Sequence, residues 1–225
     1  MTLARIAELL QPFLDPANGQ QLTSNDLQNI STYIDILQRW NFRINLTAIR
    51  DEEQIITRHF GESLFAARHL FPKSSVSSVP SVVKDFEVAD VGSGAGFPGV
   101  PMKLWSPTIS LTLIESNQKK ATFLREVARA LTLTDINIQT TRAETLPPHA
   151  FDVVTLRAVE RFESILPVAA NLVRAAGSLA LLIGCAQEPQ ARLILPSLLW
   201  SHPIPIPNSR SRILLLAESP IPSGT

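Results

Sequence analysis

The chain has 225 residues, of which 45% are hydrophobic and 18% are charged. This composition supplies enough apolar side chains for a packed core and excludes global disorder. Lysine and arginine together number 20, as do aspartate and glutamate, so the formal net charge is zero. A protein that coats nucleic acid through bulk positive charge is therefore disfavoured.

The cysteine count and the N-terminus restrict the cellular setting. The single cysteine, Cys185, excludes a disulfide framework within the chain and a multi-cysteine zinc site, and we expect it to be a small buried hydrophobe in a reducing compartment. Residues 1–14 contain Arg5 and Glu8 and lack the uninterrupted apolar run of a signal peptide. The longest apolar stretch, residues 178–186, is far shorter than the ~20 residues needed to cross a bilayer. These features predict a cytoplasmic protein.

Residues 1–71 are predicted to form an N-terminal helical extension. Apolar residues recur at helical spacing in residues 3–13, and further helices are expected from Thr23 or Ser24 onward and over residues 53–70. The apolar stripe of the second helix should comprise Leu27, Ile30, Ile34, Leu37 and Phe42. Residues 72–84 are rich in serine and proline, which is typical of a linker.

Residues 85–225 show strands alternating with helices. Apolar strands are predicted at 86–91, 109–114, 136–140, 151–156 and 179–183, with helices at 97–105, 117–131 and 162–175. This alternation indicates an α/β fold with a mostly parallel sheet, for which we expect seven strands and one antiparallel strand over 211–218. Three prolines at 203, 205 and 207 cannot donate to a ladder, so that stretch should be an edge strand or a loop.

The most informative stretch, residues 88–99, holds glycine at alternating positions, Gly92, Gly94 and Gly96. It follows a predicted strand and precedes a predicted helix, which is the context of a nucleotide-binding loop. Glycine lets the backbone turn sharply and approach a ligand closely. A dinucleotide fingerprint would require glycine at position 97, where the chain has Phe97, so a dinucleotide-dependent oxidoreductase is disfavoured.

A carboxylate follows this loop at the end of the second predicted strand. Glu115 lies about 20 residues beyond the loop, where an acidic side chain can accept both ribose hydroxyls of an adenosine. Asp90, just before the glycines, can orient either the loop or the methionine amine of a cofactor. Loop and carboxylate together favour an adenosyl cofactor such as S-adenosylmethionine; the alternative is a tight strand-to-helix turn with a surface glutamate.

Three stretches of the sequence together resemble one family over roughly residues 33–217. They are residues 40–47 with the pairs at 58–59 and 62–63, residues 92–99, and residues 142–144 with the pairs at 151–152 and 157–158. In combination they resemble the glucose-inhibited division protein B family, also called RsmG. The resemblance implies a class I, Rossmann-like methyltransferase fold. It also implies methyl transfer from S-adenosylmethionine to N7 of a guanine in 16S, small-subunit ribosomal RNA.

The resemblance also implies roles for individual residues. The backbone at Gly92 and the side chain of Phe97 would contact the cofactor. Ala143 and Glu144 would lie beside the adenine, and Arg157 would be catalytic on the cofactor or target side of the pocket. The structural alternatives are that Phe97 packs in the core and that Arg157 pairs with a nearby glutamate, Glu160 or Glu163.

Further residues would border the substrate, and the chain departs from the family pattern at others. Asn45, His59 and Arg142 are expected on the substrate side. Glu62 replaces the usual aspartate, and Leu156 replaces a serine. Ile183 stands where a lysine is expected at the end of the fifth strand, which weakens the case for a phosphate contact there.

The chemistry of the residues agrees with guanine N7 as the acceptor atom. Methylation of pyrimidine C5 needs a cysteine nucleophile, and Cys185 is not in a suitable motif. Guanine N7 has a free lone pair, so proximity and in-line orientation suffice without a general base. In this interpretation Arg157 orients the pocket and can hydrogen-bond O6 of the base.

Two other functions remain open: a methyltransferase for another substrate, and a non-catalytic RNA-binding protein with the same fold. For the leading hypothesis we expect a monomer that meets small-subunit ribosomal RNA or the 30S subunit. We expect neither a metal nor a membrane to take part.

Overall fold

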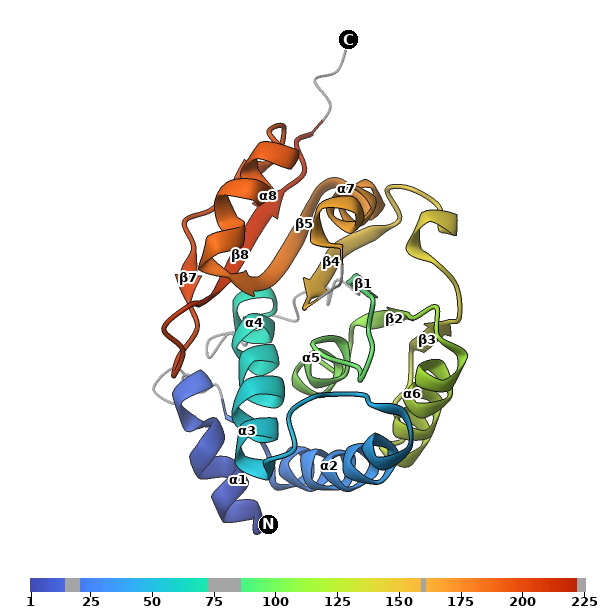
Figure 1. The fold of residues 1–225 in the computed structure, drawn as a ribbon, viewed down its shortest axis with the longest axis vertical. Helices are drawn as coiled ribbons and strands as arrows, with labels where there is room; N and C mark the ends of the chain where they lie inside the picture. The colour runs from blue at the N-terminus through green and yellow to red at the C-terminus, as the bar shows by residue number, and fades with distance from the viewer. Residues whose placement is uncertain (15–20, 73–85, 159–160, 222–225) are drawn as a thin grey trace, which may run out of the picture.

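The structure is a computed structural model that describes residues 1–14, 21–72, 86–158 and 161–221. Within these ranges the chain forms an eight-stranded sheet in the order β3-β2-β1-β4-β5-β8-β6, with β7 also pairing to β8 (Figure 1). The predicted linker at 72–84 lies, apart from Pro72, outside the described residues. The α/β architecture predicted from the alternating pattern is confirmed, with one strand more than expected.

The N-terminal part is helical, as predicted. It comprises α1 (Leu3–Leu10), the 3-10 turn η1 (Gln11–Phe13), α2 (Ser24–Ile44), α3 (Glu52–Gln54), the π-helical turn η3 (Ile55–Gly61) and α4 (Glu62–Leu70). Thr23 begins α2 with a capping box, in which its hydroxyl accepts from the Asp26 amide while the Asp26 carboxylate accepts from the Thr23 amide. The helix ends at Asn45, which adopts a left-handed conformation with φ 30°.

The predicted apolar stripe of α2 is correct for most of its length and wrong at its end. Ile30, Ile34 and Leu37 are buried, but Phe42 is 89% exposed. One turn after Leu37 the inward position falls on Asn41, which is buried and holds the following loop through two hydrogen bonds to the backbone of Thr47.

Five strands form the parallel part of the sheet. They are β1 (Glu87–Val91), β2 (Ser110–Ile114), β3 (Ile136–Gln139), β4 (Phe151–Arg157) and β5 (Val173–Gly184). The intervening segments are α5 (Gly99–Trp105), α6 (Gln118–Ala130), η4 (Ala143–Thr145) and α7 (Phe162–Leu172). The carboxyl ends of all five strands therefore meet at one edge, where open α/β sheets bind ligands.

The fifth strand begins earlier than predicted. The helical pattern expected to reach residue 175 stops at Leu172, and pairing with β4 then begins at Val173 and resumes, after an irregularity, at Ser178. A side chain at Gly177 would come within 2.8 Å of the Asp152 carbonyl oxygen. Within the irregularity Ala176 has a positive φ of 56° and its amide donates to the Ser219 carbonyl oxygen, so the two alanines before Gly177 do not continue the helix.

The C-terminal part returns antiparallel to the sheet. It comprises η5 (Cys185–Gln187), α8 (Glu188–Ile194), β6 (Leu199–Trp200), β7 (Ile204–Pro205) and β8 (Arg212–Glu218). The proline-rich stretch supplies the short strand β7, in agreement with an edge position. The expectation that Cys185 is buried is wrong: β5 ends at Gly184, the chain leaves the sheet, and Cys185 is exposed in the following turn.

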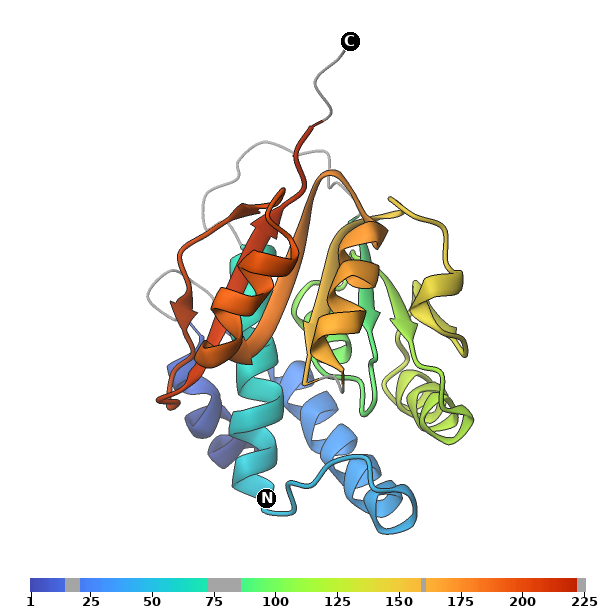
Figure 2. The same cartoon turned by 45° about the horizontal axis from the view of Figure 1, so that its top comes forward.

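Alternating residues of the strands belong to two apolar clusters on opposite faces of the sheet. Val88 and Val153 belong to the cluster that contains the N-terminal helices, α5 and α6, whereas Ala89 and Val154 belong to the cluster with α7 and α8. The pictures show α7 and α8 across the sheet from α2 (Figures 1 and 2). The N-terminal helices thus extend one of the two helical layers. None of the described helices has both the length and the apolar character required to span a membrane.

Candidate active site

The turn between β1 and α5, residues 92–98, is called the glycine loop below. Gly92, Gly94 and Gly96 have positive φ angles of 69°, 54° and 82°, a region that glycine enters without steric cost. A side-chain carbon at Gly94 would meet only the Gly92 carbonyl oxygen, at 3.7 Å, so this part of the loop faces open space. A side-chain carbon at Gly96 would overlap the Tyr33 hydroxyl, so this part is packed against α2.

Glu115 follows β2 and fastens the glycine loop. One carboxylate oxygen accepts from the Gly94 amide at 2.9 Å and the other from the Asn117 amide at 2.7 Å. The residue is only 7% exposed. An ionised carboxylate has about four acceptor positions, so these two bonds leave capacity for further donors such as ribose hydroxyls. Glu115 is thus held rigidly rather than lying free on the surface.

Asp90 is fully buried beneath the loop. Its carboxylate accepts from the Thr155 hydroxyl at 2.9 Å and from the Gly99 amide, at the start of α5, at 3.2 Å. Burial raises the pKa of Asp90 to about 6, and hydrogen bonds from Thr155 and Gly99 oppose that rise. Of the two roles expected for Asp90, these contacts fit the orientation of the loop and its helix.

Phe97 forms the centre of a stack of rings. It is 5% exposed and lies nearly parallel to Tyr33, with 5.3 Å between ring centroids, and to His59, at 4.8 Å. The edge of Phe60 meets it at 5.1 Å. The Tyr33 hydroxyl donates to the Ala95 carbonyl, which fixes the loop from below. These contacts agree with the alternative in which Phe97 packs in the core.

His59 projects from η3 and is held neutral. Its Nε2 lies 2.7 Å from the Thr47 hydroxyl, and its Nδ1 lies 3.2 Å from both terminal nitrogens of Arg157. Arginine only donates, so Nδ1 is the acceptor and the proton resides on Nε2. Burial, and then the nearby Arg157, lower the pKa of His59 to about 3. The ring is therefore uncharged at neutral pH and a very weak base.

Three guanidinium groups surround one buried carboxylate, and this set is called the arginine cluster. Glu62 is 1% exposed and accepts from Arg58 Nε at 3.1 Å, Arg157 Nη2 at 3.3 Å and Arg212 Nε at 2.9 Å. Arg157 also donates to the Arg58 carbonyl oxygen at 2.6 Å. Arg157 is thus paired with Glu62 and not with Glu163, one of the two glutamates expected as its partner. The other, Glu160, lies outside the described residues.

The other predicted site residues lie in two places. Arg142 and Glu144 are exposed and flank the buried Ala143 on η4, directly after β3. Asn45 is exposed at the end of α2, and its side-chain oxygen accepts from Arg50 at 3.3 Å. The following loop reaches the candidate site through the bond between Thr47 and His59. Arg157 and His59 are therefore brought into contact, whereas Asn45 and Arg142 lie outside that contact.

Comparisons with known proteins decide the family. A family model described as rRNA small subunit methyltransferase G matches residues 26–193. A ribosomal RNA small subunit methyltransferase G from Roseiflexus castenholzii is 35% identical over 220 residues, which cover 92% of this chain and 89% of that protein. One from Xanthomonas campestris pv. campestris is 37% identical over 172 residues, 75% of each chain. This chain belongs to the rRNA small subunit methyltransferase G family.

Solved structures confirm the class I methyltransferase fold of this family member. A ribosomal protein L11 methylase from Lactobacillus delbrueckii subsp. bulgaricus superposes with a TM-score of 0.55 at 17% identity, covering 72% of this chain and 79% of that one. A SAM-dependent methyltransferase from Aquifex aeolicus gives 0.51 at 15% identity, covering 59% and 81%. At these identities the likeness concerns the fold.

Several side chains that form the site of this methyltransferase are not predicted from its sequence. Tyr33, the only tyrosine in the chain, had no local motif to mark it, and Glu62 was noted only as a departure from the family pattern. Arg212 lies 150 residues from the carboxylate that it contacts. Only the antiparallel register, which places Arg212 beside Gly184 at the end of β5, brings it to the site.

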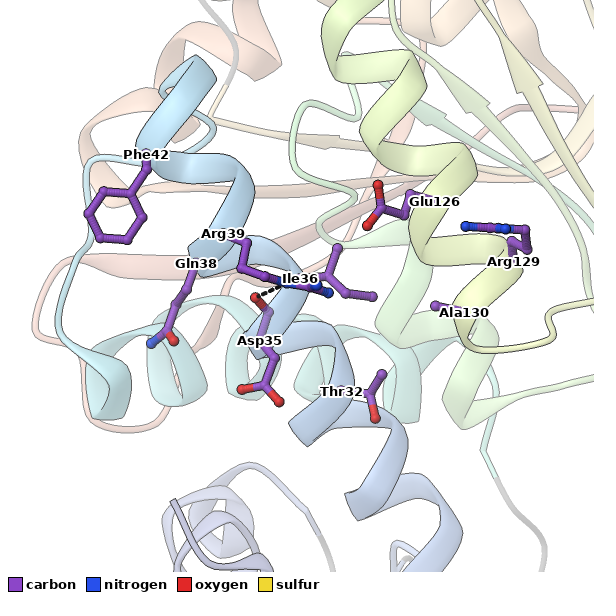
Figure 3. A pocket seen from close by; sticks show the side chains of 9 residues that line it. All are labelled: Thr32, Asp35, Ile36, Gln38, Arg39, Phe42, Glu126, Arg129 and Ala130. Atoms are coloured by element: carbon purple, nitrogen blue, oxygen red, sulfur yellow. Dashed lines mark hydrogen bonds between the residues drawn. The ribbon is translucent and has the colours of Figure 1, made fainter.

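A separate hollow of about 790 Å³ lies between α2 and α6 (Figure 3). Residues of α2 line one side and residues of α6 the other; they are Thr32, Asp35, Ile36, Gln38, Arg39, Phe42, Glu126, Arg129 and Ala130. Its charged side chains comprise two of each sign. This hollow contains none of the residues predicted for the site.

Proposed function

We propose that this protein transfers the methyl group of S-adenosylmethionine to N7 of a guanine in 16S, small-subunit ribosomal RNA. The observation that carries the proposal is the glycine loop, whose Gly94 amide is bound by Glu115, next to the contact between Arg157 and His59. Membership of the family supports the reaction class and the ribosomal substrate.

The residues around the loop fit an adenosyl cofactor. Gly94 faces open space, which leaves room for a ligand against the backbone, and Glu115 keeps acceptor capacity for hydroxyl groups. Ala143 and Glu144, after the third strand, are proposed beside the adenine. When bound, the cofactor supplies an electrophilic methyl group on a positively charged sulfur.

The acid–base character of the site favours N7 over acceptors that must lose a proton. His59, with a pKa of about 3 and its Nδ1 facing Arg157, is a poor general base. The carboxylate of Asp90 is committed to Thr155 and Gly99. The lone pair of guanine N7 forms the new nitrogen–carbon bond while the carbon–sulfur bond breaks, so the base becomes cationic and no proton moves.

The side chains of the protein are proposed to position the target base relative to the glycine loop. Arg157 ties η3 to the end of β4 through the Arg58 carbonyl and His59, and His59 stacks on Phe97 of the glycine loop. This rigid connection fixes the target side of the pocket relative to the loop, and orientation of this kind is a large part of catalysis. Asn45 and Arg142 are proposed at the edge of the substrate site.

We propose that the protein acts in the cytoplasm as a monomer, on free small-subunit ribosomal RNA or on the 30S subunit. The proposal includes neither a metal nor a membrane. Incubation with radiolabelled S-adenosylmethionine and each RNA form, followed by mapping of the label, tests the reaction. Label on a single guanine, at a position cleaved by aniline after reduction, is the expected result because that treatment reports N7 methylation.

Other results would favour the remaining hypotheses. Label on a different atom, a small molecule or a protein would favour a methyltransferase of another specificity. Measurable binding of S-adenosylhomocysteine without transfer to RNA would favour a non-catalytic RNA-binding protein. Calorimetric titration with S-adenosylhomocysteine and with NAD separates the cofactors, and binding of NAD alone would contradict the proposal.

A further inference from the structure

The arginine cluster has more positive charge than Glu62 neutralises, and Glu62 is the one carboxylate that contacts it among the residues that the structure describes. Arg58, Arg157 and Arg212 all contact Glu62, so the four side chains together carry a charge of +2. His59 is neutral, and Asp90, the next carboxylate toward the loop, is bound to Thr155 and Gly99 rather than to an arginine.

The cluster is also short of hydrogen-bond acceptors. The side chain of Arg157 is 8% exposed, and its buried Nε has no partner among the described residues. A buried N–H of a charged group without an acceptor is costly. Burial and the neighbouring Arg212 and Arg58 lower the pKa of Arg157, while Glu62 opposes that change. The excess positive charge indicates that an anion completes the cluster at its exposed guanidinium groups, those of Arg58 and Arg212.

The cluster lies where a ligand of this fold is expected. Arg157 is the last residue of β4, and Arg212, the first residue of β8, is paired with Gly184 at the end of β5. This is the carboxyl edge of the sheet, which also carries the glycine loop. The side chain of Arg58 is 47% exposed and that of Arg212 is 18% exposed, so both can be reached from solvent.

We propose that Arg58 and Arg212, held in place by Glu62, bind a phosphate group of the substrate RNA beside the methylated base. This inference rests on the proposed function. Guanidinium groups match phosphate through paired N–H donors, and a phosphodiester supplies the acceptors and the negative charge that the cluster lacks. The carboxylate of the cofactor's methionine is the competing anion, and it would bind the same groups.

The test compares Arg212→Gln and Arg58→Gln with the wild-type protein. Filter retention measures binding to free small-subunit ribosomal RNA at several salt concentrations, and calorimetry measures binding of S-adenosylhomocysteine. We expect RNA affinity to fall about 10-fold in each variant, as for loss of a charged hydrogen bond. The slope of log affinity against log salt should fall by about 0.7 for each single-strand phosphate that the variant no longer neutralises. Affinity for S-adenosylhomocysteine should stay within about twofold.

Two matched variants separate binding from folding. Arg212→Lys keeps the charge but not the paired N–H donors, so it should keep the wild-type salt slope while its RNA affinity falls between those of wild type and Arg212→Gln. Arg192→Gln removes one positive charge from a partly buried pair on α8, near the opposite end of β8, and should leave RNA affinity and its salt slope unchanged. Thermal unfolding of each variant identifies any that is not folded, in which case Arg212→Lys and Arg58→Gln carry the comparison.

The outcomes distinguish failure of the proposed phosphate site from failure of the proposed methyl transfer. An unchanged salt slope in Arg212→Gln and Arg58→Gln would overturn the phosphate site. Loss of S-adenosylhomocysteine binding with normal RNA binding would assign the cluster to the cofactor carboxylate and also overturn it. Because RNA retention requires no methyl transfer, a wild-type protein that binds RNA without modifying it would contradict the proposed function while leaving the phosphate site measurable.

Discussion

The glycine loop and the arginine cluster share the carboxyl edge of the sheet and are joined by the stacked rings of Phe97 and His59, yet they are built differently. The loop is one continuous segment whose backbone is shaped by glycines and fastened by Glu115 from the neighbouring strand. The cluster draws side chains from η3, α4, β4 and β8 around Glu62. A site made of backbone depends on local sequence, whereas a site made of distant side chains depends on the completed fold.

The largest expected effect comes from the centre of the cluster. Glu62→Gln removes the negative charge that contacts all three guanidinium groups and leaves these groups facing one another. Breaking a buried charge pair in this way costs about 3–5 kcal/mol, so urea unfolding should show a loss of that order. The variant has more uncompensated positive charge in the cluster. Added sulfate should therefore increase the free energy of unfolding more in the variant than in the wild-type protein. Stability equal to wild type would contradict the burial and pairing described for Glu62.

The next effect tests the open side of the loop. Gly94→Asp places a carboxylate in the space beside Gly94, next to the carboxylate of Glu115. Because aspartate tolerates positive φ better than most residues, the fold should persist, while the new side chain occupies the space through which a ligand would approach the backbone. Exclusion of the ligand from the loop backbone should raise Kd by more than about 100-fold, which corresponds to about 2.8 kcal/mol of lost binding free energy. Calorimetric titration with S-adenosylhomocysteine measures this, and unchanged affinity would count against a cofactor at the loop.

The packed side of the loop should respond in stability instead. Gly96→Ala puts a methyl group where the Tyr33 hydroxyl lies, at a φ of 82° that alanine disfavours. We expect a loss of about 2–3 kcal/mol in the free energy of unfolding. Tyr33→Phe alone should cost about 1 kcal/mol, because it removes the bond to the Ala95 carbonyl.

The double variant sharpens the interpretation. Removing the hydroxyl makes room for the added methyl, so Gly96→Ala with Tyr33→Phe should lose less stability than the sum of the single changes. Additive losses would mean that backbone strain alone, and not contact with α2, requires glycine at position 96.

The last effect concerns the pH dependence of stability and Asp90. Because burial raises the pKa of Asp90 from 3.8 to about 6, the folded protein holds this proton more tightly than the unfolded chain does. Deprotonation therefore destabilises the fold as pH rises between those values, by about 2–3 kcal/mol. Asp90→Asn removes this dependence. The stability of Asp90→Asn relative to wild type should increase from pH 4 to pH 6.5 in urea unfolding, and a constant or decreasing difference would contradict the raised pKa.

The same contrast explains which features could be predicted from sequence. Residues that act through nearby backbone can be predicted: Thr23, one of the two residues expected to begin α2, the three loop glycines, and Glu115 at the end of β2. Phe42 was placed wrongly because the inward position after Leu37 falls one residue earlier, on Asn41. The burial of Cys185 was predicted from residue type alone, but its exposure is decided by where β5 ends.

Residues of the arginine cluster were predictable only in part. Arg157 and His59 were identified through the family resemblance, which gave their positions but not their mutual contact. The loss of the expected lysine at Ile183 suggested a missing cation at the end of β5. Ile183 is in fact buried, and Arg212 reaches that end of the sheet from the antiparallel strand. No spacing rule within one helix or strand predicts a partner 150 residues away.

The late position of β8 has a consequence for synthesis of the chain. Until β8 has been made, the outer edge of β5 has no hydrogen-bonding partner among the preceding described strands, and unpaired strand edges promote association between chains. Glu62 would meanwhile hold two arginines, and the third would arrive only after the rest of the sheet could form. A nascent chain that stops before residue 212 should therefore contain the complete glycine loop but an incomplete arginine cluster. The exposed edge of β5 would need protection until β8 is made.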